Sequence, residues 1–398
     1  MGNNSHKPAI RFQGFTDAWE QRKYGDVMDL LSGQDFAPSD YNDEGFGMPY
    51  MTGASCIQNG QTMEMRWTPV PKCIAEKGDV LLVCKGSGYG TLARLTQEKA
   101  HIARQFMALK CKTGLNNTFN YYLAESVVSS IKTDARGLIA GIDRSAVLRQ
   151  NVVLPKVEEQ QRIGAFFNNL DNLITLHQRK YEKLKTVKKS MLEKMFPRDG
   201  SNNPEIRFIG FTDPWEQHKL SEVLTSYTDP VDIPHTGYER LGIRSHAKGT
   251  FHSYVPEGHE LQTAQMHKVA ANKFIVNITF GWEHAVAVTD ENDAGKLVSH
   301  RFPQFSLSED LDPKFLKYII LDENFRHHLW LASPGGAGRN RVLNLTEMLQ
   351  YEICIPNLSE QRQIADVLIR LDNLITLHHL KLEKLKNIKQ SLLQNMFV

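Results

Sequence analysis

Apolar side chains recur at alternating steps of four and three residues in two long stretches of this chain. The first series contains Ile163, Phe167, Leu170, Ile174, His177, Tyr181, Leu184, Lys188, Met191 and Met195. The second contains Ile364, Leu368, Leu371, Ile375, His378, Leu382, Leu385, Lys389, Leu392 and Met396. This spacing predicts two long helices, from about Gln160 to Phe196 and from about Glu360 to Phe397, that pack along one seam. At about 1.5 Å per residue, each helix would be about 55 Å long.

The two stretches are also copies of each other. EQQRIGAFFNNLDNLITLHQRK from Glu159 returns as EQRQIADVLIRLDNLITLHHLK from Glu360, and IRFQGFTDAWEQ from Ile10 returns as IRFIGFTDPWEQ from Ile206. The regions between the repeated blocks differ in sequence. A repeat of this length predicts one scaffold used twice, here with two unlike inserts.

Each seam has a histidine and a lysine in the same two places, His177 with Lys188 and His378 with Lys389. Polar groups at seam positions can fix the register, because they penalise misaligned pairings. The alternative is that the histidines lie at a solvent-exposed edge of the seam. A metal site is disfavoured, because no second ligand lies beside either histidine at helical spacing.

Prolines and glycines divide the chain into segments. The stretch 197–204, PRDGSNNP, ends the first helix and predicts a linker. A strand-like run meets a proline and then acidic residues before each helix, in VVLPKVEEQ and ICIPNLSEQ, and acidic residues suit a helix start. The predicted segments are a first domain over 1–158, a helix over 159–196, the linker over 197–204, a second domain over 205–359 and a second helix over 360–398.

The inserts combine α and β patterns. KGDVLLVCKGSGYGTLARL from Lys77 and NKFIVNITFGWEHAVAVTD from Asn272 each predict a hairpin with a glycine-containing turn. Each is followed by a predicted helix, NYYLAESVVSSI or FLKYIILDENFRHHL, and by a glycine-rich loop, DARGLIAGIDR or SPGGAGRNR. The predicted fold class is mixed α+β, with two similar domains and a pseudo-two-fold internal repeat.

Composition narrows the class of protein. A chain of 398 residues is long enough for two domains and connecting helices. Its five cysteines include no Cys-x-x-Cys pair, which argues against a zinc ribbon and a disulfide framework and suits a reducing cytosol. No run approaches the ~18 apolar residues of a membrane span, so a cytoplasmic location is expected. With a net charge of +2, a nucleic-acid surface would have to be a local concentration of Lys and Arg.

The motifs of common enzymes are missing from the sequence. GSGYG at 86–90 lacks the third glycine of a dinucleotide fingerprint and lies in a hairpin. GxxxxGK[ST], HExxH, GxSxG and DFG do not occur. Dispersed catalytic groups remain open, but the prediction shifts towards binding.

The order of these blocks resembles the specificity subunit of type I restriction-modification systems. The resemblance is carried by RFxGFTDxWE at Arg11 and Arg207, by the Glu-Gln helix starts after Pro155 and Pro356, and by the repeated LDNLITLH, and it covers nearly the whole chain. It implies a non-catalytic DNA-recognition subunit whose inserts are target recognition domains, each reading one half of a bipartite asymmetric sequence. It also implies that the two helices pack antiparallel between the domains.

The same resemblance implies the partners and cofactors. Two methyltransferase subunits would dock on the helix pair, and ATP-dependent restriction subunits would join them. Adenine methylation would then be a partner's activity, and S-adenosylmethionine, ATP and Mg would be bound by partners, with no cofactor or metal in this chain. Double-stranded DNA would be the ligand.

The candidate DNA-contacting residues lie in the hairpin turns and basic loops. In the first domain they are Lys85, Ser87, Tyr89, Arg94, Arg104 and Arg136. In the second domain they are Arg244, His246, Lys248, Trp282, His284, Arg301, Arg339 and Arg341. The alternative for each is a solvated surface charge or a packed aromatic ring. The alternative for the whole chain is a coiled-coil interaction scaffold without sequence-specific DNA binding; a self-contained methyltransferase is poorly supported, because no Asn-Pro-Pro-[FY] motif occurs.

Overall fold

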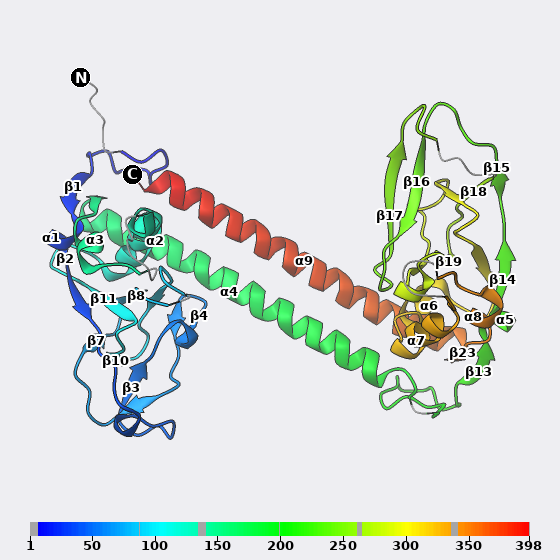
Figure 1. The fold of residues 1–398 in the computed structure, drawn as a ribbon, viewed down its shortest axis with the longest axis horizontal. Coiled ribbons are helices and arrows are strands. Elements are labelled where there is room, and N and C mark those ends of the chain that lie inside the picture. The colour runs from blue at the N-terminus through cyan, green and yellow to red at the C-terminus, as the bar shows by residue number, and fades with distance from the viewer. Residues whose placement is uncertain are drawn as a thin grey trace. The chain divides into compact units, whose positions relative to one another are not determined.

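The chain folds into two compact units that share its two longest helices. The computed structural model describes residues 7–86, 88–133, 141–198, 200–260, 265–335 and 341–397. Unit 1 is formed by Met1–Tyr181 and Leu377–Val398, and unit 2 by Glu182–Thr376. Helix α4 (Val157–Lys194) and helix α9 (Leu358–Met396) each contribute to both units (Figure 1). The predicted mixed α+β class and the two long helices are confirmed.

Unit 1 is built around a mixed sheet in the order β2-β11-β8-β9-β5-β4. These strands are β2 (Met28–Ser32), β11 (Phe106–Cys111), β8 (Val80–Val83), β9 (Leu92–Arg94), β5 (Gln61–Thr62) and β4 (Ile57–Gln58). A second sheet contains β6 (Trp67–Thr68), β3 (Met48–Met51), β10 (Lys99–Ile102) and β7 (Ile74–Glu76), and β1 (Glu20–Lys23) pairs with β12 (Asn151–Leu154). The helices are α1 (Tyr24–Val27), α2 (Asn117–Thr133) and α3 (Arg144–Leu148). All four residues of β8 are buried because separate apolar clusters cover its two faces.

Unit 2 has a similar plan, with a four-stranded and a five-stranded sheet. The first has the strands β14 (Leu224–Tyr227), β22 (Gln304–Leu307), β19 (Lys273–Val276) and β20 (Val286–Val288). The second has β15 (Pro230–Val231), β18 (Met266–Lys268), β21 (Leu297–Ser299), β16 (Tyr238–Ile243) and β17 (Thr250–Val255), and β13 (Glu216–Lys219) pairs with β23 (Glu352–Ile355). The helices are α5 (Leu220–Val223), α6 (Pro313–Ile319), α7 (Glu323–Leu331) and α8 (Leu345–Met348).

Both predicted hairpins are confirmed, since β8 pairs antiparallel with β9 and β19 with β20. The predicted helix NYYLAESVVSSI lies within α2. The single helix predicted for FLKYIILDENFRHHL is wrong, because it is divided into α6 and α7. Helix α6 ends at Ile319, and Asp322 caps the start of α7, where its side chain accepts a hydrogen bond from the Asn324 amide.

The repeated sequence blocks anchor each long helix to its own unit. In unit 1 the Arg11 guanidinium donates two hydrogen bonds of 2.7 Å to the carboxylate of Glu159, which is 1% exposed. In unit 2 Arg207 donates to the buried Glu360 in the same way, at 2.7 and 2.8 Å. In each unit, the repeated Arg-Phe block therefore supplies the arginine of an ion pair, and the repeated Glu-Gln block supplies its glutamate.

The glutamine after each of these glutamates holds the adjacent loop. The Gln160 side chain accepts from the Asn116 amide and donates to the carbonyls of Gly114 and Pro155. Gln361 makes the corresponding three hydrogen bonds with Asp312, Asp310 and Pro356. Both amide groups are thus fully used inside the protein.

Helices α4 and α9 run antiparallel. In unit 1 Lys389 lies 3.0 Å from Asp171, and the Nδ1 atoms of His177 and His378 are 2.8 Å apart. In unit 2 Lys188 lies 2.5 Å from Asp372. Partner numbers fall along α9 as they rise along α4, which confirms the antiparallel seam. The seam histidines pair with each other through their Nδ1 atoms.

The C-terminal end of one helix completes the core at the start of the other. In unit 1 the Phe397 ring stacks on Phe119 at 5.4 Å and meets Trp19 edge-on at 6.4 Å. In unit 2 Phe196 stacks on Phe315 at 5.5 Å and meets Trp215 at 6.0 Å. Each globular core therefore includes residues from a helix that follows a different insert in the sequence.

Candidate nucleic-acid interface

Two of the predicted segments of unit 2 lie against each other. The His246 amide donates to the Glu283 carbonyl at 2.9 Å, and the Ala247 amide donates to the His284 carbonyl at 2.8 Å. These bonds join the β16–β17 turn to the turn that follows β19. The backbone of His246 and His284 is left-handed, with φ of 61° at both, so the surrounding contacts hold both turns in a conformation that non-glycine residues seldom adopt. The side chains of Arg244, His246 and Lys248 are exposed on this pair of turns.

A third predicted segment reaches the same place. The Leu343 amide donates to the Ile278 carbonyl at 2.9 Å. A Cβ atom added to Gly281 would lie 2.9 Å from the Leu343 side chain, so glycine is required for this close approach. The Arg341 guanidinium lies 5.0 Å from the centroid of the Trp330 ring, a cation–π contact. Arg339 lies outside the described residues.

Trp282 and His284 have different surroundings although only one residue separates them. Trp282 is partly exposed, and its Nε1 donates to the Thr279 carbonyl at 3.2 Å. His284 is 4% exposed, and its Nε2 lies 2.7 Å from the Ile320 carbonyl oxygen. Burial lowers the pKa of His284 and so favours the neutral ring. His284 thus lies inside the unit, and we assign it a structural role in place of the predicted DNA contact.

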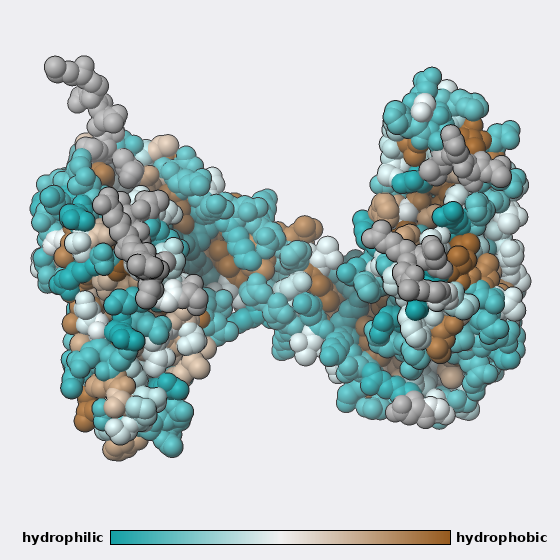
Figure 2. All heavy atoms as spheres, viewed as in Figure 1, coloured by the Kyte–Doolittle hydropathy of each residue, from teal (hydrophilic) through white to brown (hydrophobic). Residues whose placement is uncertain are grey.

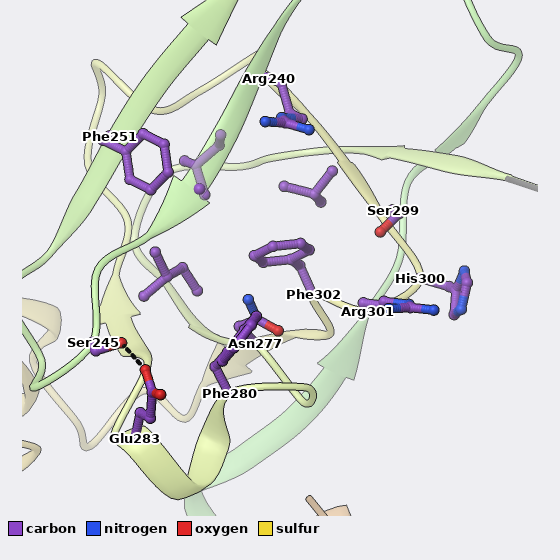
Figure 3. Close-up of a pocket in the computed structure, with 14 residues that line it drawn as sticks. Arg240, Ser245, Phe251, Asn277, Phe280, Glu283, Ser299, His300, Arg301 and Phe302 are labelled. Carbon is purple, nitrogen blue, oxygen red and sulfur yellow. Dashed lines mark hydrogen bonds between the residues drawn. The ribbon is translucent and has the colours of Figure 1, made fainter. Parts of the chain in front are cut away.

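A cleft of about 750 Å³ opens beside these turns (Figure 3). It is lined by side chains from β16, β17 and β21 and from the turns after β19 and β21, namely Arg240, Phe251, Asn277, Phe280, Glu283, Ser299, His300, Arg301 and Phe302 among others. The predicted Arg301 is therefore a wall residue of this cleft. Within the described ranges, the guanidinium groups of Arg240 and Arg301 form no ion pair or hydrogen bond.

Unit 1 places a smaller set of candidates along one edge. The Cys84 amide donates to the Gln105 carbonyl at 2.7 Å, which brings the exposed Lys85 near the exposed Arg104. Arg104 pairs with Asp35 at 2.6 Å, and its side chain is 72% exposed. Ser87 and Arg136 lie outside the described residues.

Tyr89 and Arg94 are turned towards the protein. Tyr89 is partly buried against the core of unit 1, with the Lys132 ammonium 5.3 Å from its ring centroid. The Arg94 guanidinium donates to Asn168 of α4 at 2.6 Å and lies 4.9 Å from the centroid of Tyr121. Only 16% of the Arg94 side chain is exposed. Arg94 thus joins β9 to the long helix, and we give it a structural role in place of the predicted DNA contact.

Of the cleft's wall residues, only Arg301 was among the predicted DNA contacts, and Arg240 and Phe251 are two that sequence reasoning missed. Both lie in the β16–β17 hairpin, which is not near 277–302 in sequence. One signal was present: Gly242 faces Phe251 across the two strands, and the phenyl ring covers the glycine so closely that an added Cβ would lie 2.3 Å from it. A glycine inside a strand often marks such a close approach.

The described ranges contain no group of three or more His, Cys, Asp or Glu side chains placed to hold a metal ion. No helix in this part of the chain is both long and apolar enough to cross a bilayer.

Comparison with known proteins gives one consistent family. The model for the type I restriction modification DNA specificity domain matches residues 16–186 and 248–387. The chain is 24% identical over 396 residues to the type I restriction enzyme MjaVIII specificity subunit of Methanocaldococcus jannaschii, covering 94% of this chain and 91% of that protein. Its fold is similar to the crystal structure of the type I restriction-modification S subunit from M. genitalium, with a TM-score of 0.63 and 13% identity over 98% of this chain and 99% of the other.

Proposed function

The chain belongs to the family of type I restriction-modification specificity subunits, and from this premise we propose that each of its two units reads one half of a bipartite, asymmetric DNA sequence. One observation carries the proposal. The joints that hold the two units to the long helices are the same, whereas the exposed turns differ in their side chains. Since base discrimination depends on side chains at groove edges, unlike turns on like frames suit two different half-sites.

The basic turns would supply the contacts with DNA. Lys85 and Arg104 in unit 1, and Arg244, Lys248 and Arg301 in unit 2, are exposed. Cations placed on phosphates give affinity that falls steeply with salt, whereas cations at base edges give sequence preference. We propose that both kinds of contact with double-stranded DNA come from these turns. We also propose that the protein is cytoplasmic, which suits a chain whose cysteines are free thiols.

The helix pair would carry the partner subunits. Four leucines of unit 1, Leu173, Leu176, Leu377 and Leu380, are exposed on α4 and α9 by 47%, 46%, 45% and 61%, and apolar residues are visible on the surface of both helices in Figure 2. Exposed apolar side chains that form a contiguous patch mark interaction sites. We propose that methyltransferase subunits cover them and that restriction subunits join the complex. S-adenosylmethionine, ATP and Mg would then be bound by those partners, and this chain would catalyse no reaction.

Reconstitution tests this division of labour. The purified chain, incubated with labelled S-adenosylmethionine and DNA, should transfer no methyl groups. With its methyltransferase partner it should direct adenine methylation to one split sequence, identified by methylome sequencing. Methyl transfer by the pure chain alone, or methylation without sequence preference in the complex, would contradict the proposal. The second outcome would favour a scaffold that organises partners without reading DNA.

A further inference from the structure

The cleft of unit 2 combines free cations with exposed aromatic rings. Phe251 and Phe280 are 38% and 39% exposed, and in the described part of the chain neither of them, nor Phe302, contacts another aromatic ring. Arg240 and Arg301 line the same cleft without an ion-pair partner there. Phenyl faces bind nucleobases by stacking, and guanidinium groups bind phosphates. The side chains that line the cleft can therefore bind both the base and the phosphate of a nucleotide.

Two polar side chains of the cleft are held in place. The Glu283 carboxylate accepts a hydrogen bond from the Ser245 hydroxyl through Oε2 at 2.6 Å (Figure 3). The Asn277 side chain accepts from the Thr279 amide through Oδ1 at 3.0 Å. Each bond fixes one end of the side chain and leaves the Glu283 Oε1 atom as an acceptor and the Asn277 Nδ2 group as a donor. A carboxylate acceptor favours bases that carry an exocyclic amino group, such as cytosine and adenine.

We propose that this cleft seats one unstacked nucleotide, with its base against Phe280 and its phosphate at Arg240 and Arg301. A volume of about 750 Å³ lies in the range of small-ligand sites. In an intact duplex both faces of every base are covered by stacking, so Phe280 can reach a base face only after that nucleotide has swung out of the helix. That this nucleotide belongs to DNA rests on the proposed function. A free nucleotide has the same chemistry, and the experiment below distinguishes it from a nucleotide within DNA.

The corresponding turn of unit 1 does not repeat this chemistry. The turn after β8 has the sequence CKGSGYGT at 84–91, with no phenylalanine. Its one aromatic residue, Tyr89, is packed on the core of unit 1. An extrahelical nucleotide is therefore expected in only one half-site, the one read by unit 2.

The test uses the full-length chain and duplexes of matched length, one fully paired and one with a single bulged 2-aminopurine nucleotide. The bulged duplex should bind more tightly, because its extra nucleotide is already unpaired. Its fluorescence should rise on binding, because unstacking raises the fluorescence of 2-aminopurine. Phe280→Ala should weaken this binding about 10-fold and remove the gain, because base–aromatic stacking contributes about that factor or more. Tyr254→Ala, which removes another exposed ring, on β17 and 64% exposed, should change neither signal.

Matched charge variants test the phosphate and the base edge. Arg301→Ala should weaken binding of the bulged duplex, whereas Arg326→Ala, at an exposed arginine paired with Glu323, should not. Calorimetry with dCMP, dAMP and TMP should show a preference for the amino bases, and Glu283→Gln should weaken it, because an amide can donate as well as accept. Thermal unfolding of each variant should match that of the parent chain, since every changed side chain is at least partly exposed.

Each result has a defined meaning. Equal binding of the two duplexes together with no binding of a free nucleotide, or binding of the bulged duplex that Phe280→Ala does not weaken, would overturn the nucleotide site. Tight binding of a free nucleotide together with no preference for the bulged duplex would overturn its assignment to DNA. If the Phe280→Ala complex still directs methylation to the parent sequence and no nucleotide binds, the inference fails while the proposed function stands. If the parent complex directs no methylation, the proposed function fails whatever the cleft binds.

Discussion

Glu159 and Glu360 are charged residues at buried positions, 1% and 0% exposed. A carboxylate can be buried only when its charge and its lone pairs are matched, and here the guanidinium groups of Arg11 and Arg207 match both oxygens. Removing either partner would leave a charge in the protein interior. At the residue scale, each unit therefore depends on a single arginine to keep its buried carboxylate paired.

Arg11→Ala is therefore expected to destabilise unit 1 by about 3 to 5 kcal/mol, the usual cost of leaving one member of a buried ion pair alone. Hydrogen exchange measured by mass spectrometry would show faster exchange in residues of unit 1 and little change in unit 2. Arg22→Ala is the matched control, because the Arg22–Glu20 pair is exposed by 48% and 67% and such pairs contribute ~1 kcal/mol or less. An equal effect of both variants would contradict the assigned role of Arg11.

The sequence shows where the arginines and lysines are, but it does not show which of them are held by other side chains and which are available to a ligand. Arg94 and Arg301 are both arginines that follow apolar runs, and both were predicted to contact DNA. The structure places Arg94 between β9 and α4, where Asn168 and Tyr121 hold it, and leaves Arg301 on a cleft wall. The partners of Arg94 lie 27 and 74 positions away in sequence, so only the tertiary fold brings them together.

At the scale of elements, the helix seam was the most predictable part of the molecule. Its four-three spacing and its repeat follow from packing rules that act between neighbouring turns. The hairpins were also predictable, since glycine turns join apolar runs. The break at Asp322 was not, because the apolar periodicity continues through it, and the break is held by the bond from the Tyr351 hydroxyl to the Asp322 carboxylate across 29 positions. The placement of β16 and β17 beside the cleft likewise depends on sheet packing.

The histidine pair predicts a seam whose stability depends on pH. Partial burial, then the neighbouring His177, Lys180 and Lys381, lower the pKa of His378; the rings of Tyr181 and His379 stack next to this pair. Because the folded state binds the proton less readily than the unfolded state, stability should be full above about pH 6.5, the ordinary histidine pKa, and should fall as the pH drops below it. The thermal midpoint is expected to fall between pH 7 and pH 5.5.

The double variant His177→Asn, His378→Asn tests this assignment. Asparagine keeps a polar hydrogen-bonding group in the seam but does not titrate. Its thermal midpoint should change less over the same pH range than that of the parent chain. An identical pH profile in both proteins would place the sensitivity elsewhere.

The terminal phenylalanines provide a second test at the element scale. Phe397 packs on Phe119 and Trp19, and Phe397→Ala should destabilise unit 1 by about 3 to 5 kcal/mol, as for other large-to-small changes in a core. Phe196→Ala should have the same effect on unit 2, because Phe196 packs on Phe315 and Trp215 in the same manner. Hydrogen exchange resolved by peptide would assign each loss of stability to its unit. The reverse assignment would contradict the packing of the C-terminal end of each long helix into the core at the start of the other.

At the scale of the whole molecule, the duplication predicts how half of the chain would behave. A fragment ending at Arg198 keeps the first insert and all of α4 but loses Met396 and Phe397, which complete the core of unit 1. A second copy of the fragment can supply Met195 and Phe196, the residues that fill the corresponding place in unit 2. We therefore expect the fragment to form a two-fold dimer along its seam.

Such a dimer would carry two identical inserts, so its DNA target should become a palindrome built from the half-site of unit 1. Sedimentation analysis checks the dimer, and methylome mapping of the fragment with its methyltransferase partner checks the target. The seam ion pair provides the control: with Asp171 facing Lys188 of the second copy in place of Lys389, Asp171→Lys should place like charges together and shift the fragment towards monomer. A folded monomer of the parent fragment would show that the seam does not support self-pairing. A dimer that still directed methylation to the original asymmetric sequence would show that the two inserts do not read DNA independently.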